Sequence, residues 1–503
     1  MVFYISIIFI GIFVLWGLIS SNTLSYLATS ALHFTTSKFG WLFLIITFTI
    51  LIFIIWLAMS KYGKLKLGKD TDKPKFNNIT WFSMLFSAGM GIGIIFWGVA
   101  EPLDHYVFPP LGIEPMTTQA ANTGMMYCFF HWGLHAWAIY SFVGLVIAYF
   151  KFRKGKKLLV SETITPLFKE NFPLKKIIVL IVDILTIIAT AFGVATSLGL
   201  GALQINGGLN NVFGVPITTF VQIIIIAVAT VLFLISSSTG LEKGIKILSN
   251  ANIAIAVLLL VFVFILGPTA KILELFTNTL GQYFQNIISL SLRLRPFNNS
   301  SWIANWTLFY WAWWIAWSPF VGVFIATISK GRTIREFVLG VLLVPTIFSF
   351  FWFSVFGGTA LNLQMNTSLD LTNLVKNNIS STLFVTLRSL PLGTILSVIC
   401  IILIMTFFVS SADSATYVLG MFSSNGNVNP KVSTKIIWGI LESLIAVSLL
   451  MSGGLKGLQT MSILTALPFS IILILMFASF IKALKSEKPL LKTKKKPIPP
   501  KEE

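Results

Sequence analysis

The stretch SWIANWTLFYWAWWIAWSPFVGVFIAT, residues 301–327, decides how the rest of the chain is interpreted. It contains no charged residue and is long enough to cross a bilayer, which takes about 20 apolar residues in a helix. Its six tryptophans exceed what an aromatic belt needs, because belt residues lie only at the two ends of a span. We therefore expect several indole rings at mid-membrane depth. They belong either to an ordinary helix core or to a cage whose π-faces hold a cation without N–H donors.

The composition predicts an all-α polytopic membrane protein, since 56% of the 503 residues are hydrophobic and only 11% are charged. The net charge of +19 does not indicate nucleic-acid binding, because the basic residues fall in short loops between apolar segments. Cys128 and Cys400 both lie in apolar stretches, which indicates small hydrophobic side chains without a disulfide framework or metal site. The first apolar run lacks a basic leader, so we interpret it as a mature helix.

Twelve apolar spans are predicted, and each must be helical because lipid offers no partner for the backbone. Their ranges are 2–20, 40–59, 79–100, 124–150, 177–202, 216–236, 250–268, 302–327, 336–360, 392–422, 433–451 and 458–481. If the N-terminus is cytoplasmic, 29 of the 36 Lys and Arg residues fall on the cytoplasmic side. This asymmetry supports an even number of spans, with both termini cytoplasmic in a cell membrane.

Three segments outside the spans have a character of their own. Residues 269–296 carry apolar side chains at helical spacing, which predicts an amphipathic helix lying on the outer surface. Residues 361–391 are partly apolar, and we expect them to cap the pore. The Lys- and Pro-rich tail from residue 485 would lie on the anionic cytoplasmic leaflet, either as a stop-transfer anchor or as a regulatory element.

The third span contains SMLFSAGMGIGIIFWGVAEP, residues 83–102, in which Gly89, Gly91 and Gly93 alternate. Glycine is a poor helix former, so this pattern predicts a local break in the helix. Unwound backbone at membrane depth is tolerated where it lines a cavity, and its freed carbonyls can coordinate a cation. Those carbonyls would be the ones of Ser87, Ala88 and Met90. The alternative is close helix packing, which suits Gly-x-x-x-Gly spacing better.

The fourth span places Trp132, Trp137 and Tyr140 within about 140° of the helix circumference, which allows one aromatic wall. His131 and His135 have metal-ligand spacing, but no acidic residue or cysteine accompanies them at a matching position. We interpret them as polar packing residues that could also titrate.

The tenth span contains TFFVSSADSAT, residues 406–416, which places many oxygen atoms in an apolar helix. The hydroxyls of Ser410 and Ser411, with the carbonyl of Phe407, could be hard ligands for a small cation. Alternatively, these hydroxyls bond back to carbonyls of their own helix. Asp413 is a functional candidate by its position in a span, unless it lies near the solvated cytoplasmic end.

Three motifs together closely resemble the betaine/carnitine/choline transporter family, and the likeness covers nearly the whole chain. They are GMGIG (89–93), HWGLHAWAIY (131–140) and YWAWWIAWSPFVGVFIA (310–326). The resemblance implies twelve transmembrane helices with a five-helix inverted-repeat core, in a homotrimer. The implied divisions are two accessory helices (1–78), a first repeat (79–268), the amphipathic surface helix (269–300), a second repeat (301–481) and a basic cytoplasmic tail (482–503).

The resemblance also implies site residues. The box for the substrate's cation would be Trp132, Trp137, Tyr140 and Trp314, with Trp313 and Trp317 along the path and the backbone of Gly89, Met90, Gly91 and Gly93 facing the carboxylate. A first sodium site would use Ser87, Met90, Phe407, Ser410 and Ser411, and a second would use Thr190, Tyr140 and Phe320. The chain departs from the family at Val194, where a ligand hydroxyl is expected, and this weakens the second site.

These features predict a sodium-driven symporter for glycine betaine or a related quaternary ammonium osmolyte, with sodium as coupling ion and no cofactor. Ile94 and Ile95 follow the glycines where choline transporters often carry an Asp, which favours betaine. One alternative is a proton-coupled choline transporter of the same fold with His131, His135 or Asp413 as carriers. Another is an osmosensory receptor or channel, although neither a repeated filter motif nor a ring of like charges is visible. The sequence shows no nucleophile elbow and no paired carboxylates within the spans, so nothing in it indicates an enzyme.

Overall fold

The computed structural model describes residues 1–89, 91–239, 242–294 and 301–487, with the backbone alone for 86–89, 238–239 and 242–247. Regular structure in this part of the chain is entirely helical, apart from one isolated bridge between Lys66 and Thr333. The long helices are α1 (Val2–Ile19), α2 (Ser21–Met59), α8 (Lys175–Phe213), α9 (Thr219–Thr239), α10 (Glu242–Leu266), α12 (Phe309–Ile328), α13 (Ile334–Asn366), α16 (Gly393–Ser423) and α17 (Val432–Lys485).

Ten helical segments among the described residues are long and apolar enough to cross a membrane, which confirms the all-helical membrane class. The predicted third span is not among them, because it is divided into α3 (Asn78–Gly89) and α4 (Ile92–Val107). The predicted eleventh and twelfth spans both lie within α17, on either side of a kink at Gly453 and Gly454. Gly454 has a φ of 55°, a conformation that glycine adopts without strain.

The helix break predicted in the third span is present. α3 ends at Gly89, and Gly91 has extended backbone before α4 begins at Ile92. A second break was not predicted: the fourth span is divided at Gly133 into α5 (Thr118–Trp132) and α6 (Leu134–Ala148). A Cβ on Gly133 would lie 2.8 Å from the ring of Phe350 on α13, so a neighbouring helix occupies this position.

Segments predicted to lie outside the spans also form helices. α2 begins at Ser21, although the second span was predicted from residue 40. The surface helix predicted at 269–296 is α11 (Thr269–Ser291), which packs on α5 and α13. The segment predicted to cap the pore forms α14 (Leu371–Asn377), η6 (Ile379–Ser381) and α15 (Thr382–Arg388). These elements pack on α4, which follows the third-span break, and on α8.

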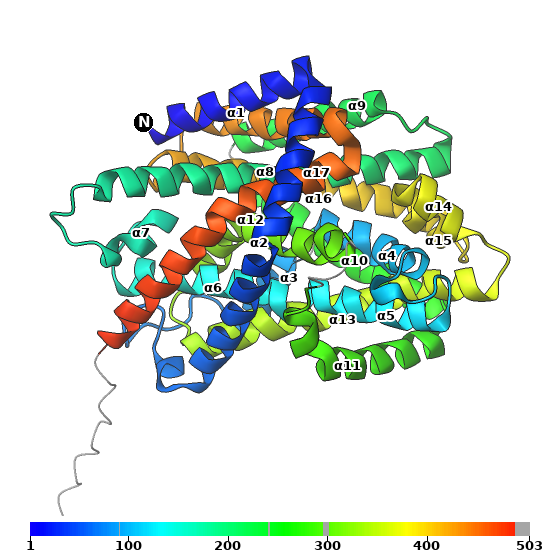
Figure 1. Cartoon of the computed structure of the whole chain (residues 1–503), viewed down its shortest axis with the longest axis horizontal. Coiled ribbons are helices and arrows are strands. Elements are labelled where there is room, and N and C mark those ends of the chain that lie inside the picture. Colours follow the sequence, from blue (N-terminus) through cyan, green and yellow to red (C-terminus); the bar gives the residue numbers. More distant parts are fainter. Residues whose placement is uncertain (90, 240–241, 295–300, 488–503) are drawn as a thin grey trace, which may run out of the picture.

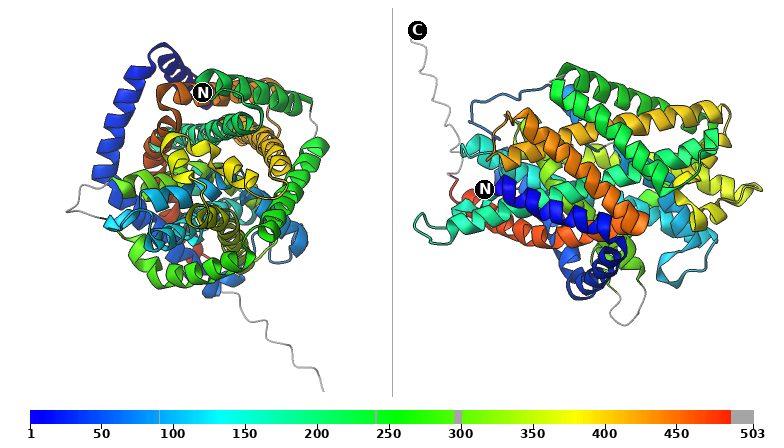
Figure 2. Two further views of the ribbon diagram at one scale, coloured as in Figure 1. Left: turned by 90° about the vertical axis from the view of Figure 1, so that its right-hand side faces the viewer. Right: turned by 90° about the horizontal axis from the view of Figure 1, so that it is seen from above.

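The helices are arranged as an inner group surrounded by peripheral ones (Figures 1 and 2). α6 and α12 pack along one another in the interior, and α8 packs against α12, α16 and α17. α1, α9 and α10 lie at the periphery in the end-on view (Figure 2). Large apolar side chains on these outer faces are exposed, including Ile224, Leu232, Leu258 and Phe262. Contiguous exposed apolar surface of this kind is typical of contact with lipid.

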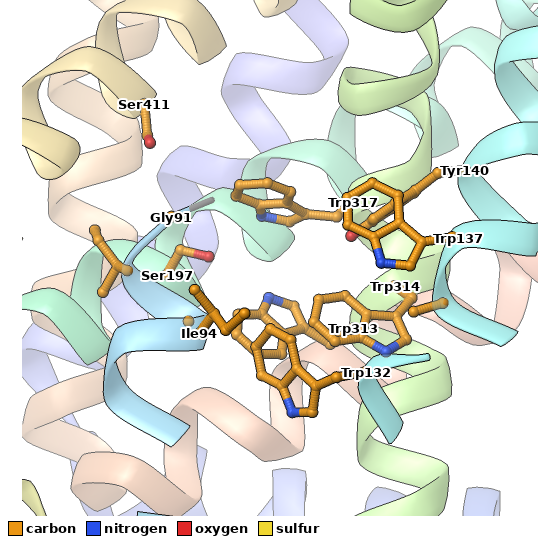
Figure 3. Close-up of a pocket in the computed structure, with 13 residues that line it drawn as sticks. Gly91, Ile94, Trp132, Trp137, Tyr140, Ser197, Trp313, Trp314, Trp317 and Ser411 are labelled. Atoms are coloured by element: carbon orange, nitrogen blue, oxygen red, sulfur yellow. The ribbon is translucent and has the colours of Figure 1, made fainter. Parts of the chain in front are cut away.

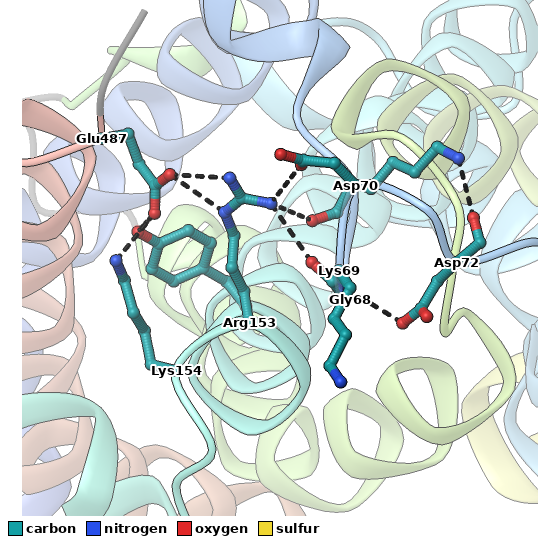
Figure 4. Close-up of polar contacts among 9 residues, drawn as sticks. Gly68, Lys69, Asp70, Asp72, Arg153, Lys154 and Glu487 are labelled. Carbon is teal, nitrogen blue, oxygen red and sulfur yellow. Dashed lines mark hydrogen bonds and ion pairs between the residues drawn. The ribbon is translucent and has the colours of Figure 1, made fainter. Parts of the chain in front are cut away.

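α1 begins and α17 ends at the same end of the molecule, on the left in Figure 1. At this end five residues form a cluster, hereafter the tail cluster: Asp70, Tyr149, Arg153, Lys154 and Glu487 (Figure 4). Arg153 and Lys154 contact the Glu487 carboxylate at 2.8 Å and 2.7 Å, and Arg153 also contacts Asp70 at 2.8 Å. Burial by itself would raise the pKa of Glu487, but hydrogen bonds from Arg153, Lys154 and Tyr149 outweigh it and lower the pKa from 4.5 to about 2. The cluster ties the end of α17 to the segment after α6.

Candidate functional site

A cavity lies between the helix break of the third span and the aromatic side chains of α5, α6 and α12 (Figure 3). About 560 Å³ of space is free of protein atoms there, and this figure includes open solvent. Its lining consists of Gly91, Ile92, Gly93, Ile94, Trp132, Ala136, Trp137, Tyr140, Ser197, Trp313, Trp314, Trp317 and Ser411. The structure therefore brings eight of the predicted substrate residues to one cavity.

Three indoles form one tier of the cavity wall. Trp313 and Trp314 are stacked with ring centroids 4.8 Å apart, and the edge of Trp132 meets Trp314 at 4.9 Å. Trp132 comes from the last turn of α5, immediately before the Gly133 break, whereas the other two are neighbours on α12. The break thus allows Trp132 to pack against α12 while the chain continues as α6.

A second tier, formed by Trp137, Tyr140 and Trp317, faces the first across the gap (Figure 3). Trp137 and Tyr140 are on α6 with ring centroids 5.5 Å apart, and Tyr140 meets Trp314 of the first tier at 6.0 Å. Such distances are those of interacting aromatic pairs. The cavity is therefore surrounded by aromatic faces on two sides, as a cation cage requires.

The remaining wall combines small residues with two isoleucines, Ile92 and Ile94 of α4. Gly91 and Gly93 come from the start of α4, Ser197 from α8 and Ser411 from α16. A Cβ on Gly93 would lie 2.6 Å from Trp313 and 3.2 Å from Trp132, so only glycine leaves room for both rings. A Cβ on Gly91 would meet nothing within 4 Å. The two glycines therefore have different roles, one in packing and one in the cavity surface.

Three buried polar groups around the cavity have no hydrogen-bond partner among the described residues. They are the hydroxyl of Tyr140 and the indole nitrogens of Trp313 and Trp317. In Figure 3 both nitrogens lie on the ring edges that face the gap. An indole N–H can only donate, and a buried donor without an acceptor costs about 1–3 kcal/mol. An anionic group in the cavity would satisfy these donors.

The first predicted cation site is only partly visible. The Ser410 hydroxyl donates to the Phe407 carbonyl at 3.3 Å and accepts from the Asn252 amide at 3.3 Å. Its neighbour Ser411 lines the cavity. Near the end of α3, only the backbone of Ser87 and Gly89 is described, and Met90 lies outside the described residues. A Cβ on Gly201 of α8 would lie 3.0 Å from both Ile92 and Phe408, so the start of α4 lies close to this part of α16.

The second predicted cation site, formed by Thr190, Tyr140 and Phe320, lies only partly at the cavity. Neither Thr190 nor Phe320 lines it, although Tyr140 does. The Thr190 hydroxyl donates to the carbonyl of Thr186 at 2.7 Å, as expected for a hydroxyl in a helix. Val194, one turn further on, is buried and has no side-chain oxygen.

The interpretation of His131 and His135 as polar packing groups is in accord with their contacts. His131 Nδ1 lies 2.6 Å from a carboxylate oxygen of Glu101, and His135 Nε2 lies 2.7 Å from the hydroxyl of Ser291. Within the described part of the chain, ligand atoms of Glu101, His105 and Cys128 lie within 4.8 Å of one another. Both Glu101 oxygens are already hydrogen-bonded, however, which argues against a metal there. Glu101 was overlooked in the sequence, where the signal was an ionisable residue directly after the predicted span 79–100.

Comparison with known proteins identifies the family. A model described as BCCT, betaine/carnitine/choline family transporter, matches residues 1–489. The chain is 50% identical over 499 residues to the glycine betaine transporter OpuD of Bacillus subtilis (strain 168), covering 98% of this chain and 96% of that protein. It is 49% identical over 489 residues to an ectoine/hydroxyectoine transporter of Virgibacillus pantothenticus, covering 97% of each. A probable glycine betaine transporter of Desulfitobacterium hafniense (strain Y51) is 44% identical over 493 residues, covering 97% of this chain and 98% of that protein.

These relatives are transporters rather than enzymes, in agreement with the absence of catalytic motifs from the sequence. The family match covers the helix break, the two aromatic tiers and all ten apolar helical segments. The chain is a multi-pass membrane transporter, and it belongs to the betaine/carnitine/choline transporter family.

Proposed function

We propose that the protein is a secondary active symporter that imports glycine betaine, or a related quaternary ammonium osmolyte, by alternating access driven by the sodium gradient. The observation that carries this proposal is the cavity between two facing aromatic tiers, with a helix break beside it. A quaternary ammonium has no N–H group, so π-faces are its natural partners, each contributing about 0.5–2 kcal/mol. Trp132, Trp314, Trp137 and Tyr140 would surround it.

The carboxylate of the substrate would face the wall beside the helix break. α4 begins at Ile92 with no side-chain cap, so its first amide groups and the positive end of its helix dipole suit an anion. The unpartnered indole N–H groups of Trp313 and Trp317 would add hydrogen bonds to the same anion. A zwitterion thus fits the cavity with its cation among the rings and its carboxylate toward Gly91 and Gly93.

Sodium would be the second transported species. The carbonyl and hydroxyl oxygens assigned to the first site, on Ser87, Met90, Phe407, Ser410 and Ser411, are hard ligands suited to a small hard cation. This site joins the third-span break to α16, and such a link would couple ion binding to substrate binding. The second site, with Thr190 and Phe320, is the weaker part of the proposal, because Val194 supplies no oxygen.

The proposed architecture has twelve transmembrane helices with two five-helix inverted repeats, assembled as a homotrimer in the plasma membrane. The two helices counted beyond the ten apolar segments are α3 with α4 and the second half of α17. Both termini would be cytoplasmic, which is supported by the gathering of α7 (Val160–Ile164) and the basic 151–176 segment at the end where α1 begins and α17 ends. Lipid would contact the outer helices.

Uptake of labelled glycine betaine by proteoliposomes tests the proposal. We expect accumulation with an inward sodium gradient and none when potassium replaces sodium. Accumulation driven equally by a proton gradient without sodium would instead favour the proton-coupled alternative, and preference for choline in competition would change the substrate. Binding without counterflow of labelled betaine would indicate a receptor, and saturation-free flux would indicate a channel.

A second candidate substrate is ectoine, because a relative of nearly equal identity is an ectoine/hydroxyectoine transporter. Ectoine is also a zwitterion, but its cationic ring carries N–H groups that need acceptors. The hydroxyls of Ser197, Ser411 and Tyr140 around the cavity could accept them. Competition of unlabelled ectoine against labelled betaine decides between the two, and the better substrate is the one with the lower inhibition constant.

A further inference from the structure

A buried carboxylate with an unusual set of partners lies immediately behind the aromatic cavity. The side chain of Glu101 on α4 is fully buried, and one of its oxygens lies 2.6 Å from His131 Nδ1 and 3.3 Å from His105 Nε2. Its other oxygen accepts from the indole N–H of Trp132 at 2.9 Å and from the hydroxyl of Tyr310 at 2.5 Å. We call these five residues the Glu101 cluster. Acceptance at both oxygens suits the ionised carboxylate, which has no proton to donate.

Two members of the Glu101 cluster connect it to the rings of the cavity. Trp132 itself lines the cavity, and Tyr310 stacks on Trp314 with ring centroids 5.7 Å apart. The backbone carbonyl of His131 accepts from the indole N–H of Trp314 at 3.0 Å. Two of the four rings assigned to the cation, those of Trp132 and Trp314, are therefore positioned by contacts with residues of the Glu101 cluster.

The negative charge of Glu101 is separated from the cavity by a single indole ring. An indole N–H that donates to a carboxylate is polarised, so the π-faces of the ring become more negative. Hydrogen bonds polarise one another more strongly in a low-dielectric interior, and charges act over longer distances there than in water. Among the described residues no Lys or Arg forms an ion pair with Glu101; the groups within ion-pair distance are the imidazoles of His105 and His131, which carry a charge only when protonated.

We propose that Glu101 is a positioning residue for cation recognition, acting through its hydrogen bond to Trp132. It fixes the orientation of that ring and makes its face a stronger partner for a quaternary ammonium. This inference rests on the proposed function, because it assumes that the cavity binds a cationic group. It differs from a merely structural role for Glu101, which would change the amount of folded protein rather than the affinity for substrate.

A double-mutant cycle on betaine uptake tests the inference. We expect Glu101→Gln to raise the KM about tenfold, which corresponds to about 1.4 kcal/mol. The effect on the maximal rate per folded protein should be smaller. Trp132→Phe keeps an aromatic face but has no N–H, so adding Glu101→Gln to it should raise the KM less than threefold further. Trp137→Phe removes an indole of the same cavity without contact to Glu101, and its effect should multiply with that of Glu101→Gln. Non-additivity confined to the first pair is the signature of a direct coupling.

The controls separate the possible outcomes. Glu114→Gln replaces an exposed carboxylate on the segment between α4 and α5 and should leave the KM unchanged. If Glu101→Gln does not fold, Trp132→Phe alone must raise the KM more than Trp137→Phe does. Multiplicative effects for both pairs, or an unchanged KM with only a lower maximal rate, would overturn the inference. Failure of the wild-type protein to take up or bind betaine would instead overturn the proposed function.

Discussion

The Glu101 cluster and the tail cluster each stabilise one carboxylate, the first among membrane-spanning helices and the second at one end of the molecule. Each holds one carboxylate with several donors: Glu101 bonds two imidazoles, an indole and a phenol, whereas Glu487 bonds Arg153, Lys154 and the hydroxyl of Tyr149. The Glu101 side chain is fully buried among membrane-spanning helices. The Glu487 side chain is 8% exposed, and its partner Lys154 is 34% exposed.

The difference shows how the surroundings select the donors. A full cation beside Glu101 would have to be desolvated as well, and that cost can exceed the gain from pairing in the interior. Uncharged imidazole, indole and phenol groups satisfy the carboxylate instead, and one of them, the indole of Trp132, also lines the cavity. At the water-exposed end, lysine and arginine stay partly hydrated, and their attraction is screened by salt. The first cluster should therefore be insensitive to salt, whereas the second should weaken as salt is added.

The largest contrast is expected when each carboxylate is removed. Glu101→Ala leaves four buried groups without their acceptor and should destabilise the protein by about 3–5 kcal/mol. Glu487→Ala should cost about 1 kcal/mol, because Arg153 keeps its contact with Asp70 and the partly exposed Lys154 can be hydrated. Thermal unfolding of both variants in detergent measures the difference. Equal shifts in Tm would show that burial does not distinguish the two clusters.

A matched pair of hydroxyl deletions gives a smaller contrast. Tyr310→Phe removes the phenol that donates to Glu101 at 2.5 Å, and Tyr149→Phe removes the one that donates to Glu487 at 2.7 Å. A buried bond to a charged group contributes about 1.5–3 kcal/mol, so Tyr310→Phe should lower the Tm clearly. Tyr149→Phe should cost less than about 1 kcal/mol, since two cations remain. The same unfolding assay tests this, and a larger loss at Tyr149 would contradict it.

The two cavity glycines test whether ring positions near the Glu101 cluster determine affinity. Gly93→Ala places a methyl group 2.6 Å from Trp313, which must shift, so we expect the KM for betaine to rise about tenfold. Gly91→Ala meets nothing within 4 Å and has extended backbone that any residue adopts. Its KM should rise less than about threefold. Uptake kinetics of the two variants, normalised to protein amount, give the comparison, and a reversed order would refute it.

The smallest effect concerns acid. The pKa of Glu487 is about 2 in the folded protein and 4.5 without its partners, so it stabilises the fold fully above pH 4.5. This contribution declines as the pH falls below 4.5 and is lost as it passes through about 2. The Tm difference between wild type and Glu487→Gln should therefore be largest near pH 7 and should shrink toward zero in strong acid. About 1 M salt should reduce it at pH 7 as well. A difference that is constant with pH would exclude the ionised carboxylate as its source.

Much of the cavity could be predicted from local patterns. Alternating glycines predicted the break between Gly89 and Ile92, and the structure has it. The tryptophans of residues 301–327 proved to have different positions: Trp313, Trp314 and Trp317 line the cavity, whereas Trp306 packs on His105 and Trp97. The roles of the lining residues in binding remain predictions. Composition alone placed the chain in a membrane, because 56% hydrophobic residues leave too little polar surface for a soluble fold.

Other features depend on which helix faces meet, and no local pattern encodes that. At the Gly133 break, the ring of Phe350 occupies the space beside the backbone, and it comes from a helix more than 200 residues away in the sequence. Ser197 reaches the cavity because α8 packs against the start of α4, and Glu101 finds its four partners on three different helices. Periodicity along a helix specifies which residues share a face, since backbone hydrogen bonds are local in lipid. The choice of face that each helix presents to its neighbours is decided only by packing among all of them.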